Sequence, residues 1–231
     1  MAERMTSKDI AFAEKMCSGT SKTNNEDFDK NGYLVVKNLY DPEKLYRPVP
    51  EIRGQLNYWG KNEDEFRHTP LEAQVEGSVA CYWHPQYRDV HSHIRLKLEK
   101  IIGKKLFNTY YYDRFYFPGQ ELKIHCDRPS CEISVSVHVS SNVKEPWKLW
   151  IKTPDIDDVK GENHSVILDV GDGMIYKGCE RPHWREPLPK EYERKWYGKK
   201  VEKEGLYYHQ IFFHYVLADG IRSHFANDAA H

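Results

Sequence analysis

The sequence of 231 residues lacks the features that would point to several classes of protein. It has almost no net charge, because 34 basic and 35 acidic side chains leave −1, so no overall basic field favours nucleic acid as a partner. No run of about 18 apolar residues occurs, which argues against a membrane span. The first 30 residues contain no apolar stretch of the kind that a signal peptide needs. We therefore expect a cytoplasmic protein that binds neither nucleic acid nor a membrane.

Cysteine does not occur in any pattern that binds zinc. No CxxC is present, and the spacings of the 5 cysteines match neither a zinc finger nor a zinc ribbon. An odd number of cysteines cannot all pair, so we expect reduced thiols, as in most cytoplasmic proteins. Hydrophobic residues, at 39%, and aromatic residues, at 13%, are by contrast plentiful. This composition is that of a globular domain with a sizeable core.

The first half of the sequence predicts turns, short strands and helices. The apolar YLVV at 33–36 follows an Asn-Gly turn and predicts a strand, while Asp41-Pro42 is typical of a helix start. Residues 48–90 show no clear period and predict a loop-rich region. Apolar residues at helical spacing over 86–103, ending on a glycine, predict an amphipathic helix.

The second half predicts strands separated by Pro-Gly, Gly-Glu-Asn and Asp-Gly turns, which is typical of a β-sandwich or jelly roll. We predict one domain over 27–222, α+β in class but mainly β. It lies between a polar N-terminal segment 1–26, expected to be poorly ordered or to hold a short helix near 8–16, and a tail 223–231. A charged insertion, 186–205, is expected to form a surface loop or a lid. The predicted strands cover 106–117, 122–127, 132–140, 148–153, 165–170, 173–178 and 206–217.

A His-x-Asp pair, His125 and Asp127, stands in the predicted strand LKIHCD. Alternate side chains of a strand point to the same face, so this imidazole and this carboxylate converge. Such a pair is common by chance, and a core histidine beside a turn aspartate is the alternative. A third candidate, His183, follows the later Asp-Gly turn and the strand after it, which we expect to end at His183. Two histidines and one carboxylate on one side of a metal form the facial triad of non-heme Fe(II) oxygenases.

The stretches HCD, GDGMIYKGCERPHW and HQIFFHYVLADG resemble the Fe(II)/2-oxoglutarate-dependent dioxygenases, near their prolyl 4-hydroxylase-like and phytanoyl-CoA hydroxylase-like branches. FDKNGYLVVKNLYDPEKL is similar to the way those chains begin, so the resemblance spans roughly 27–220. It implies a double-stranded β-helix (jelly roll, cupin-like) with N-terminal helices packed on the major sheet. It also implies that His125, Asp127 and His183 are the catalytic residues and bind Fe(II), with 2-oxoglutarate and O₂ as cosubstrates.

That family binds the far carboxylate of 2-oxoglutarate with an arginine or lysine, usually on the strand after the last histidine. Here that strand offers the residues at 207–210, Tyr-Tyr-His-Gln, instead. We therefore assign Arg185, two residues beyond His183, because it faces the same side of an extended chain and its planar fork suits a carboxylate. Tyr116 and Tyr208 are expected to donate their hydroxyls to the same anion.

Several polar residues have alternative interpretations. The anion could instead meet a basic side chain of the insertion, namely Lys190, Arg194 or Lys195. Arg185 could form an ordinary surface ion pair with Glu186, and Arg128 could meet a substrate carboxylate or a backbone carbonyl. His138 and His214, each inside an apolar strand, are expected to be hydrogen-bonded core groups.

The resemblance thus implies a dioxygenase that hydroxylates an unactivated C–H bond and converts 2-oxoglutarate to succinate. Its substrate would be a small molecule or a peptidyl side chain, such as a prolyl residue. Two alternatives are a cupin-like ligand-binding module and a metal-dependent enzyme that uses no keto acid, which the missing basic residue on the last strand favours. Substrate specificity depends on loops, here 48–90 and 186–205, so neither the substrate nor the oligomeric state follows from the sequence.

Overall fold

The computed structural model describes residues 21–156 and 158–227, and most of the regular structure is β. Its helices are α2 (Glu26–Asn31), α3 (Pro42–Leu45) and α4 (Arg88–Ile102), with single 3-10 turns at Pro85–Tyr87, Pro129–Cys131 and Ser223–Phe225. The strands are β1 (Tyr33–Val36), β2 (Gly54–Tyr58), β3 (Phe66–Thr69), β4 (Val79–Tyr82), β5 (Leu106–Tyr116), β6 (Leu122–His125), β7 (Ile133–Ser141), β8 (Leu149–Lys152), β9 (Asn163–Val166), β10 (Gly173–Tyr176), β11 (His183–Arg185), β12 (Tyr192–Arg194), β13 (Lys200–Glu202) and β14 (Tyr208–Leu217).

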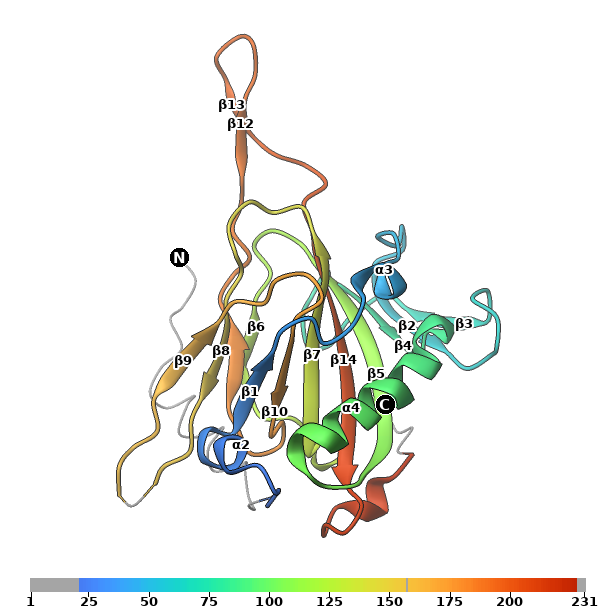
Figure 1. Cartoon of the computed structure of the whole chain (residues 1–231). Coiled ribbons are helices and arrows are strands. Elements are labelled where there is room, and N and C mark those ends of the chain that lie inside the picture. Colours follow the sequence, from blue (N-terminus) through green and yellow to red (C-terminus); the bar gives the residue numbers. More distant parts are fainter. Residues whose placement is uncertain (1–20, 157, 228–231) are drawn as a thin grey trace.

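Two sheets face each other and form a barrel (Figure 1). The larger sheet has eight strands in the order β1-β10-β7-β14-β5-β4-β2-β3, and the smaller has four in the order β6-β11-β8-β9. The chain crosses between them from β5 to β6 to β7, and again from β10 to β11 to β14. This winding is the predicted double-stranded β-helix, with β2, β3 and β4 added at one edge of the larger sheet.

Alternation along the central strands separates an apolar outer face of the larger sheet from a polar inner face. On β14 the side chains of Ile211 and Phe213 belong to the core that also contains Ile94 and Leu98 of α4. The preceding residue, Gln210, instead contacts Arg185 of the smaller sheet, inside the barrel. Because side chains alternate with a period of two, one strand serves the helix-covered core and the barrel interior at once.

Helix α4 confirms the prediction of an amphipathic helix packed on the larger sheet (Figure 1). It begins at Arg88 and ends at Gly103, whose φ of +67° closes the helix in the left-handed conformation. The start at Asp41-Pro42 is confirmed as well, since the Asp41 carboxylate accepts a hydrogen bond from the Glu43 N–H and caps α3. The predicted helix near residues 8–16 lies outside the described residues.

Three predictions of local structure need correction. The stretch 48–90 is rich in loops, as predicted, but it also contains three short strands that the sequence did not predict, β2, β3 and β4. The charged insertion forms a β12–β13 hairpin that projects from the barrel (Figure 1). The strand before His183 ends at Tyr176, so that His183 opens a separate strand, β11. The proposed division into 1–26, 27–222 and 223–231 stays a prediction.

No helix within 21–156 and 158–227 is long and apolar enough to cross a membrane. Cys81, Cys131 and Cys179 are free and buried. Cys126, however, takes part in a disulfide bond, so the prediction of reduced thiols is wrong at this position. The cytoplasmic location stays a prediction.

Candidate metal centre

Strands β6 and β11 bring His125, Asp127 and His183 together. His183 lies directly opposite His125 in the antiparallel pair of these strands, and their ring centroids are 4.3 Å apart. The Oδ1 atom of Asp127 lies 3.4 Å from His125 Nε2 and 3.6 Å from His183 Nε2. The three candidate ligand atoms all lie within 4.8 Å of one another, which is a spacing that one metal ion can bridge.

Backbone carbonyls orient both imidazoles. The Nδ1 atom of His125 lies 2.8 Å from the Lys123 carbonyl oxygen, and that of His183 lies 2.9 Å from the Arg181 carbonyl oxygen. Each Nδ1–H therefore donates to a carbonyl oxygen, so that each Nε2 faces the shared centre and carries a lone pair there when the ring is neutral. This outer arrangement is usual around metal-binding histidines, where it fixes the tautomer and the ring orientation.

The carboxyl group of Asp127 stays ionised in this position. Burial alone would raise the pKa of Asp127. The neighbouring His183 and His125 lower it by more than burial raises it, and the resulting pKa is well below the ordinary value. Burial lowers the pKa of His183, but the Asp127 carboxylate and the Arg181 carbonyl oxygen together raise it, and the net pKa lies above the ordinary value. The two shifts have one cause, the attraction between an anion and the rings that face it, and a divalent cation at this point would make the same contacts.

A hydrogen-bonded chain behind Asp127 fixes its second oxygen. Ser134 Oγ lies 3.2 Å from Asp127 Oδ2 and 2.9 Å from His214 Nδ1. Because the carboxylate only accepts, the Ser134 hydroxyl donates to it and His214 Nδ1–H donates to Ser134. Asp127, Cys131 and His214 also lie close enough to form an alternative ligand group. The prediction that His214 is a hydrogen-bonded core group is confirmed, and its bond reaches the metal centre through Ser134.

The backbone at Gly178 allows Asp127 to approach. The Asp127 N–H donates a hydrogen bond of 2.9 Å to the Gly178 carbonyl oxygen. A Cβ atom at Gly178 would lie 2.5 Å from Asp127 Oδ2 and 2.6 Å from the Cys131 carbonyl oxygen, and closer still to Ser134 Oγ. Only glycine fits here without displacing the carboxylate, and no local pattern around residue 178 predicts this requirement.

Arg185 is buried inside the barrel rather than on the surface. It is 1% exposed, donates 2.6 Å and 2.8 Å hydrogen bonds to the Trp147 carbonyl oxygen and Gln210 Oε1, and its Cζ lies 4.5 Å from the Trp147 ring centroid. No carboxylate among the described residues forms an ion pair with it, so the alternative of a pair with Glu186 is wrong. Its Nε and the Gln210 Nε2 have no hydrogen-bond partner. A buried guanidinium without a counter-ion indicates an anion site.

Tyr208 lies beside Arg185, and Tyr116 packs on the same tryptophan, Trp147. The ring centroid of Tyr208 is 4.9 Å from the Arg185 Cζ, and its buried hydroxyl has no hydrogen-bond partner. Tyr116 packs edge-on against Trp147, but its hydroxyl accepts a 3.4 Å hydrogen bond from Arg114. The structure therefore brings Tyr208 to the guanidinium of Arg185, while Tyr116 is shared with a second arginine.

The basic residues of the insertion do not reach this interior. Lys190, just before β12, and Lys195, just after it, are exposed and pair with Glu202 and Glu193 respectively. Arg194 is exposed on β12. The hairpin follows β11 beyond Arg185, which pairs with Leu122 at the start of β6, whereas the ligand His125 ends β6. The insertion thus leaves the barrel at the end away from the metal centre, and a lid over the metal is not what the structure shows.

Sequence reasoning missed a second polar group beside the centre. The fully buried Arg114 of β5 forms a 3.1 Å ion pair with Glu72 and donates a 2.7 Å hydrogen bond to Gln74 Oε1. The Gln74 Nε2 in turn lies 3.0 Å from His125 Nε2. The alternation of Tyr112, Arg114 and Tyr116 could have identified Arg114 as inward-facing. Nothing in the segment between β3 and β4 predicts that Gln74 reaches the histidine.

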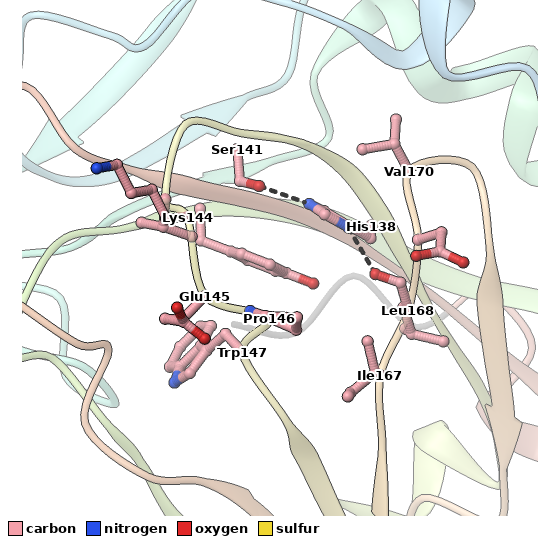
Figure 2. A pocket seen from close by; sticks show the side chains of 12 residues that line it. His138, Ser141, Lys144, Glu145, Pro146, Trp147, Ile167, Leu168 and Val170 are labelled. Atoms are coloured by element: carbon pink, nitrogen blue, oxygen red, sulfur yellow. Dashed lines mark hydrogen bonds between the residues drawn. The ribbon is translucent and has the colours of Figure 1, made fainter.

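A small cavity of about 190 Å³ lies at the end of the barrel where Tyr208 begins β14. Figure 2 shows His138 at its edge, bonded to Ser141 and to the Leu168 carbonyl oxygen. The His138 ring stacks on Tyr208, with centroids 4.2 Å apart. Burial lowers its pKa to about 4, so the ring is neutral near pH 7. The prediction that His138 is a hydrogen-bonded core group is confirmed.

No family model matches the chain, and no curated protein matches its sequence. Solved structures are similar to it in fold. The non-heme α-ketoglutarate-dependent epimerase SnoN from nogalamycin biosynthesis matches with a TM-score of 0.52 at 11% identity, over 90% of this chain and 84% of that chain. A prolyl-4-hydroxylase of Pseudomonas putida matches with a TM-score of 0.47 at 14% identity, over 82% and 95% of the two chains. The chain therefore has the double-stranded β-helix fold that occurs in the 2-oxoglutarate-dependent oxygenases, as the sequence predicted.

Proposed function

We propose that this protein is an Fe(II)/2-oxoglutarate-dependent oxygenase that hydroxylates a C–H bond and releases succinate. The observation that supports this most directly is the convergence of His125 Nε2, His183 Nε2 and the Asp127 carboxylate within 4.8 Å. Two imidazoles and one carboxylate are the donor set that Fe(II) takes in non-heme oxygenases, with positions left open for other ligands.

The residues of this chain would divide the work as follows. His125, Asp127 and His183 would bind the iron, which with 2-oxoglutarate and O₂ supplies the oxidising chemistry. Arg185 would bind the far carboxylate of 2-oxoglutarate, because two residues of extended chain place it about 7 Å beyond His183 along β11. Tyr208 and Gln210 would complete that carboxylate site. Arg114 is the weaker candidate, since Glu72 already neutralises it.

The test is binding and turnover with matched variants. Wild-type protein prepared without oxygen is expected to bind one Fe(II) and one 2-oxoglutarate and, once O₂ is admitted, to release succinate. His125→Ala and Asp127→Ala should abolish iron binding and succinate release, whereas His224→Ala, an exposed histidine outside the site, should change neither. Succinate release that persists in the ligand variants would contradict the proposal.

A metal-dependent enzyme without a keto acid is the competing candidate, since β14 offers Gln210 where a basic residue was expected. Iron binding without any shift of the melting curve by 2-oxoglutarate would favour it. We propose that the substrate is a small molecule or a peptidyl side chain. The insertion 186–205 would not cover the metal.

A further inference from the structure

A cavity of about 690 Å³ lies between the first turns of α4 and the C-terminal ends of β2 and β4 in the larger sheet. It is bounded by the end of β2, the start of β3, the first turns of α4 and the start of β5. Its volume falls within the range of small-molecule sites. None of the residues assigned above to the metal or to 2-oxoglutarate lines it.

The charged side chains that line this cavity are cationic. Arg67 and Arg88 line it, and no described aspartate or glutamate does. Neither arginine forms an ion pair among the described residues, although Arg88 donates a 3.0 Å hydrogen bond to the Gly60 carbonyl oxygen. The arrangement therefore suits a ligand that bears negative charge.

Two indole rings form the flat part of the lining. Trp59 is 67% exposed, which is unusual for tryptophan in a folded protein. Trp83 has a φ of +63°, a conformation that a large side chain rarely adopts, and packs edge-on against Tyr111. Backbone strain of this kind persists where surrounding structure holds a side chain in a particular place. Planar rings beside guanidinium groups favour a ligand that is itself planar.

The inner wall of the cavity touches the segment that follows the metal ligands. Thr109, a lining residue, donates a 2.8 Å hydrogen bond to the Ser130 carbonyl oxygen, three residues beyond Asp127. Trp83 also packs against Tyr110, at 6.4 Å between centroids, and the hydroxyl of Tyr110 lies 3.2 Å from Cys131 Sγ. A ligand in the cavity would therefore lie against the segment that positions Asp127.

We propose that this cavity binds a planar anionic ligand, an aromatic carboxylate or an aromatic phosphate ester. The ring lies against Trp59 and Trp83, and the anionic group is bound by Arg67 and Arg88. The inference goes beyond the proposed oxygenase activity and does not depend on it, because it involves no metal ligand.

The experiment is calorimetric titration of metal-free protein, kept with a chelator, with a series of matched naphthalene probes. We expect 2-naphthoate or 2-naphthyl phosphate to bind at least about tenfold more tightly than 2-naphthylmethanol, with affinity falling as salt rises. Arg67→Gln and Arg88→Gln should each weaken binding of the anion roughly tenfold and leave that of the alcohol unchanged. Trp59→Ala, at an exposed position, should weaken both.

Arg53→Gln is the matched control. Arg53 lies just before β2, at the opposite end of that strand from Trp59, and it stacks on Phe117 outside the cavity. It should bind all probes as the wild type does. Equal affinity for the naphthoate and the alcohol, the absence of measurable binding by either anion, or anion binding that survives both arginine substitutions would overturn the proposal. Because no metal is present, these outcomes are separate from success or failure of the oxygenase assay.

Discussion

Substitution of Gly178 by alanine should displace the Asp127 carboxylate and so weaken metal binding. The added Cβ would lie 2.5 Å from Asp127 Oδ2 and 2.6 Å from the Cys131 carbonyl oxygen, both well inside contact distance. The Cys131 carbonyl belongs to the backbone and cannot rotate away, so the Asp127 carboxylate must move. The Asp127 N–H is also bonded to the Gly178 carbonyl oxygen, so a shift of residue 178 moves the backbone of the ligand as well.

We expect Gly178→Ala to weaken metal binding about 10- to 100-fold, the usual result of disturbing the groups behind a ligand. Overpacking should also cost about 1–3 kcal/mol of unfolding free energy. The assay is titration with Co(II) or Mn(II), followed by absorbance or paramagnetic resonance, together with urea unfolding of the metal-free protein.

Gly173→Ala is a suitable control for the cost of overpacking. A Cβ there would meet a side-chain methyl of Leu39 and lie 3.3 Å from Val135 Cγ2, both apolar and flexible. It should lower stability without changing metal affinity. If Gly178→Ala binds metal as tightly as Gly173→Ala does, then Gly178 does not position Asp127 and the reasoning is refuted.

Three further changes test other parts of the structure. Arg185→Met should weaken 2-oxoglutarate binding by at least about tenfold, as measured by calorimetry. The melting temperature of the protein without 2-oxoglutarate should stay the same or rise, because a buried cation with no carboxylate partner is removed. Unchanged affinity for 2-oxoglutarate would show that Arg185 does not bind it. Ser134→Ala should weaken Co(II) binding about tenfold, whereas Ser134→Thr, which keeps the hydroxyl, should restore most of it; equal affinities would show that the hydroxyl does not matter. Burial lowers the pKa of His91 to about 3, so between pH 6.5 and 3 the unfolded chain takes up a proton that the folded chain does not, and stability falls as pH falls. From pH 7.5 to 5 this amounts to about 2 kcal/mol, which urea unfolding should find missing in His91→Phe; a loss of the same size in both proteins would contradict the assignment.

Part of the candidate metal centre was predictable because two of its three residues lie close together in the sequence. His125 and Asp127 are two apart on a strand, and that spacing alone puts both on one face. His183 was harder, since its pairing with His125 depends on the long-range register of β6 and β11, which only the resemblance supplied. The prediction of Arg185 used the same two-residue rule and placed it inside the barrel, although its role as an anion site stays a prediction.

What the sequence did not reveal depends on contacts between distant segments. Gln74 reaches His125 from a segment without periodic pattern, and its position depends on the Glu72–Arg114 ion pair across the edge of the larger sheet. Strand β2 pairs with β4 on one side and with the mostly exposed edge strand β3 on the other, and each of the three strands has only four or five residues, too few for a clear period. Gly178 is required by the approach of three atoms from β7 and the segments around it, which no single stretch encodes.

The β12–β13 hairpin has a consequence for how the molecule can be altered. Its stem is closed by the Leu188 N–H bond to the Gln120 carbonyl oxygen and the Asn142 N–H bond to the Tyr207 carbonyl oxygen, so the ends of the excursion are tied to the barrel without help from the tip. A chain spliced with a short turn between these ties should keep the group of His125, Asp127 and His183 intact. Trp196, at 95% exposure, would be lost with the excised piece. The hairpin is thus a place where this scaffold can be shortened, or extended by another peptide, without disturbing the barrel.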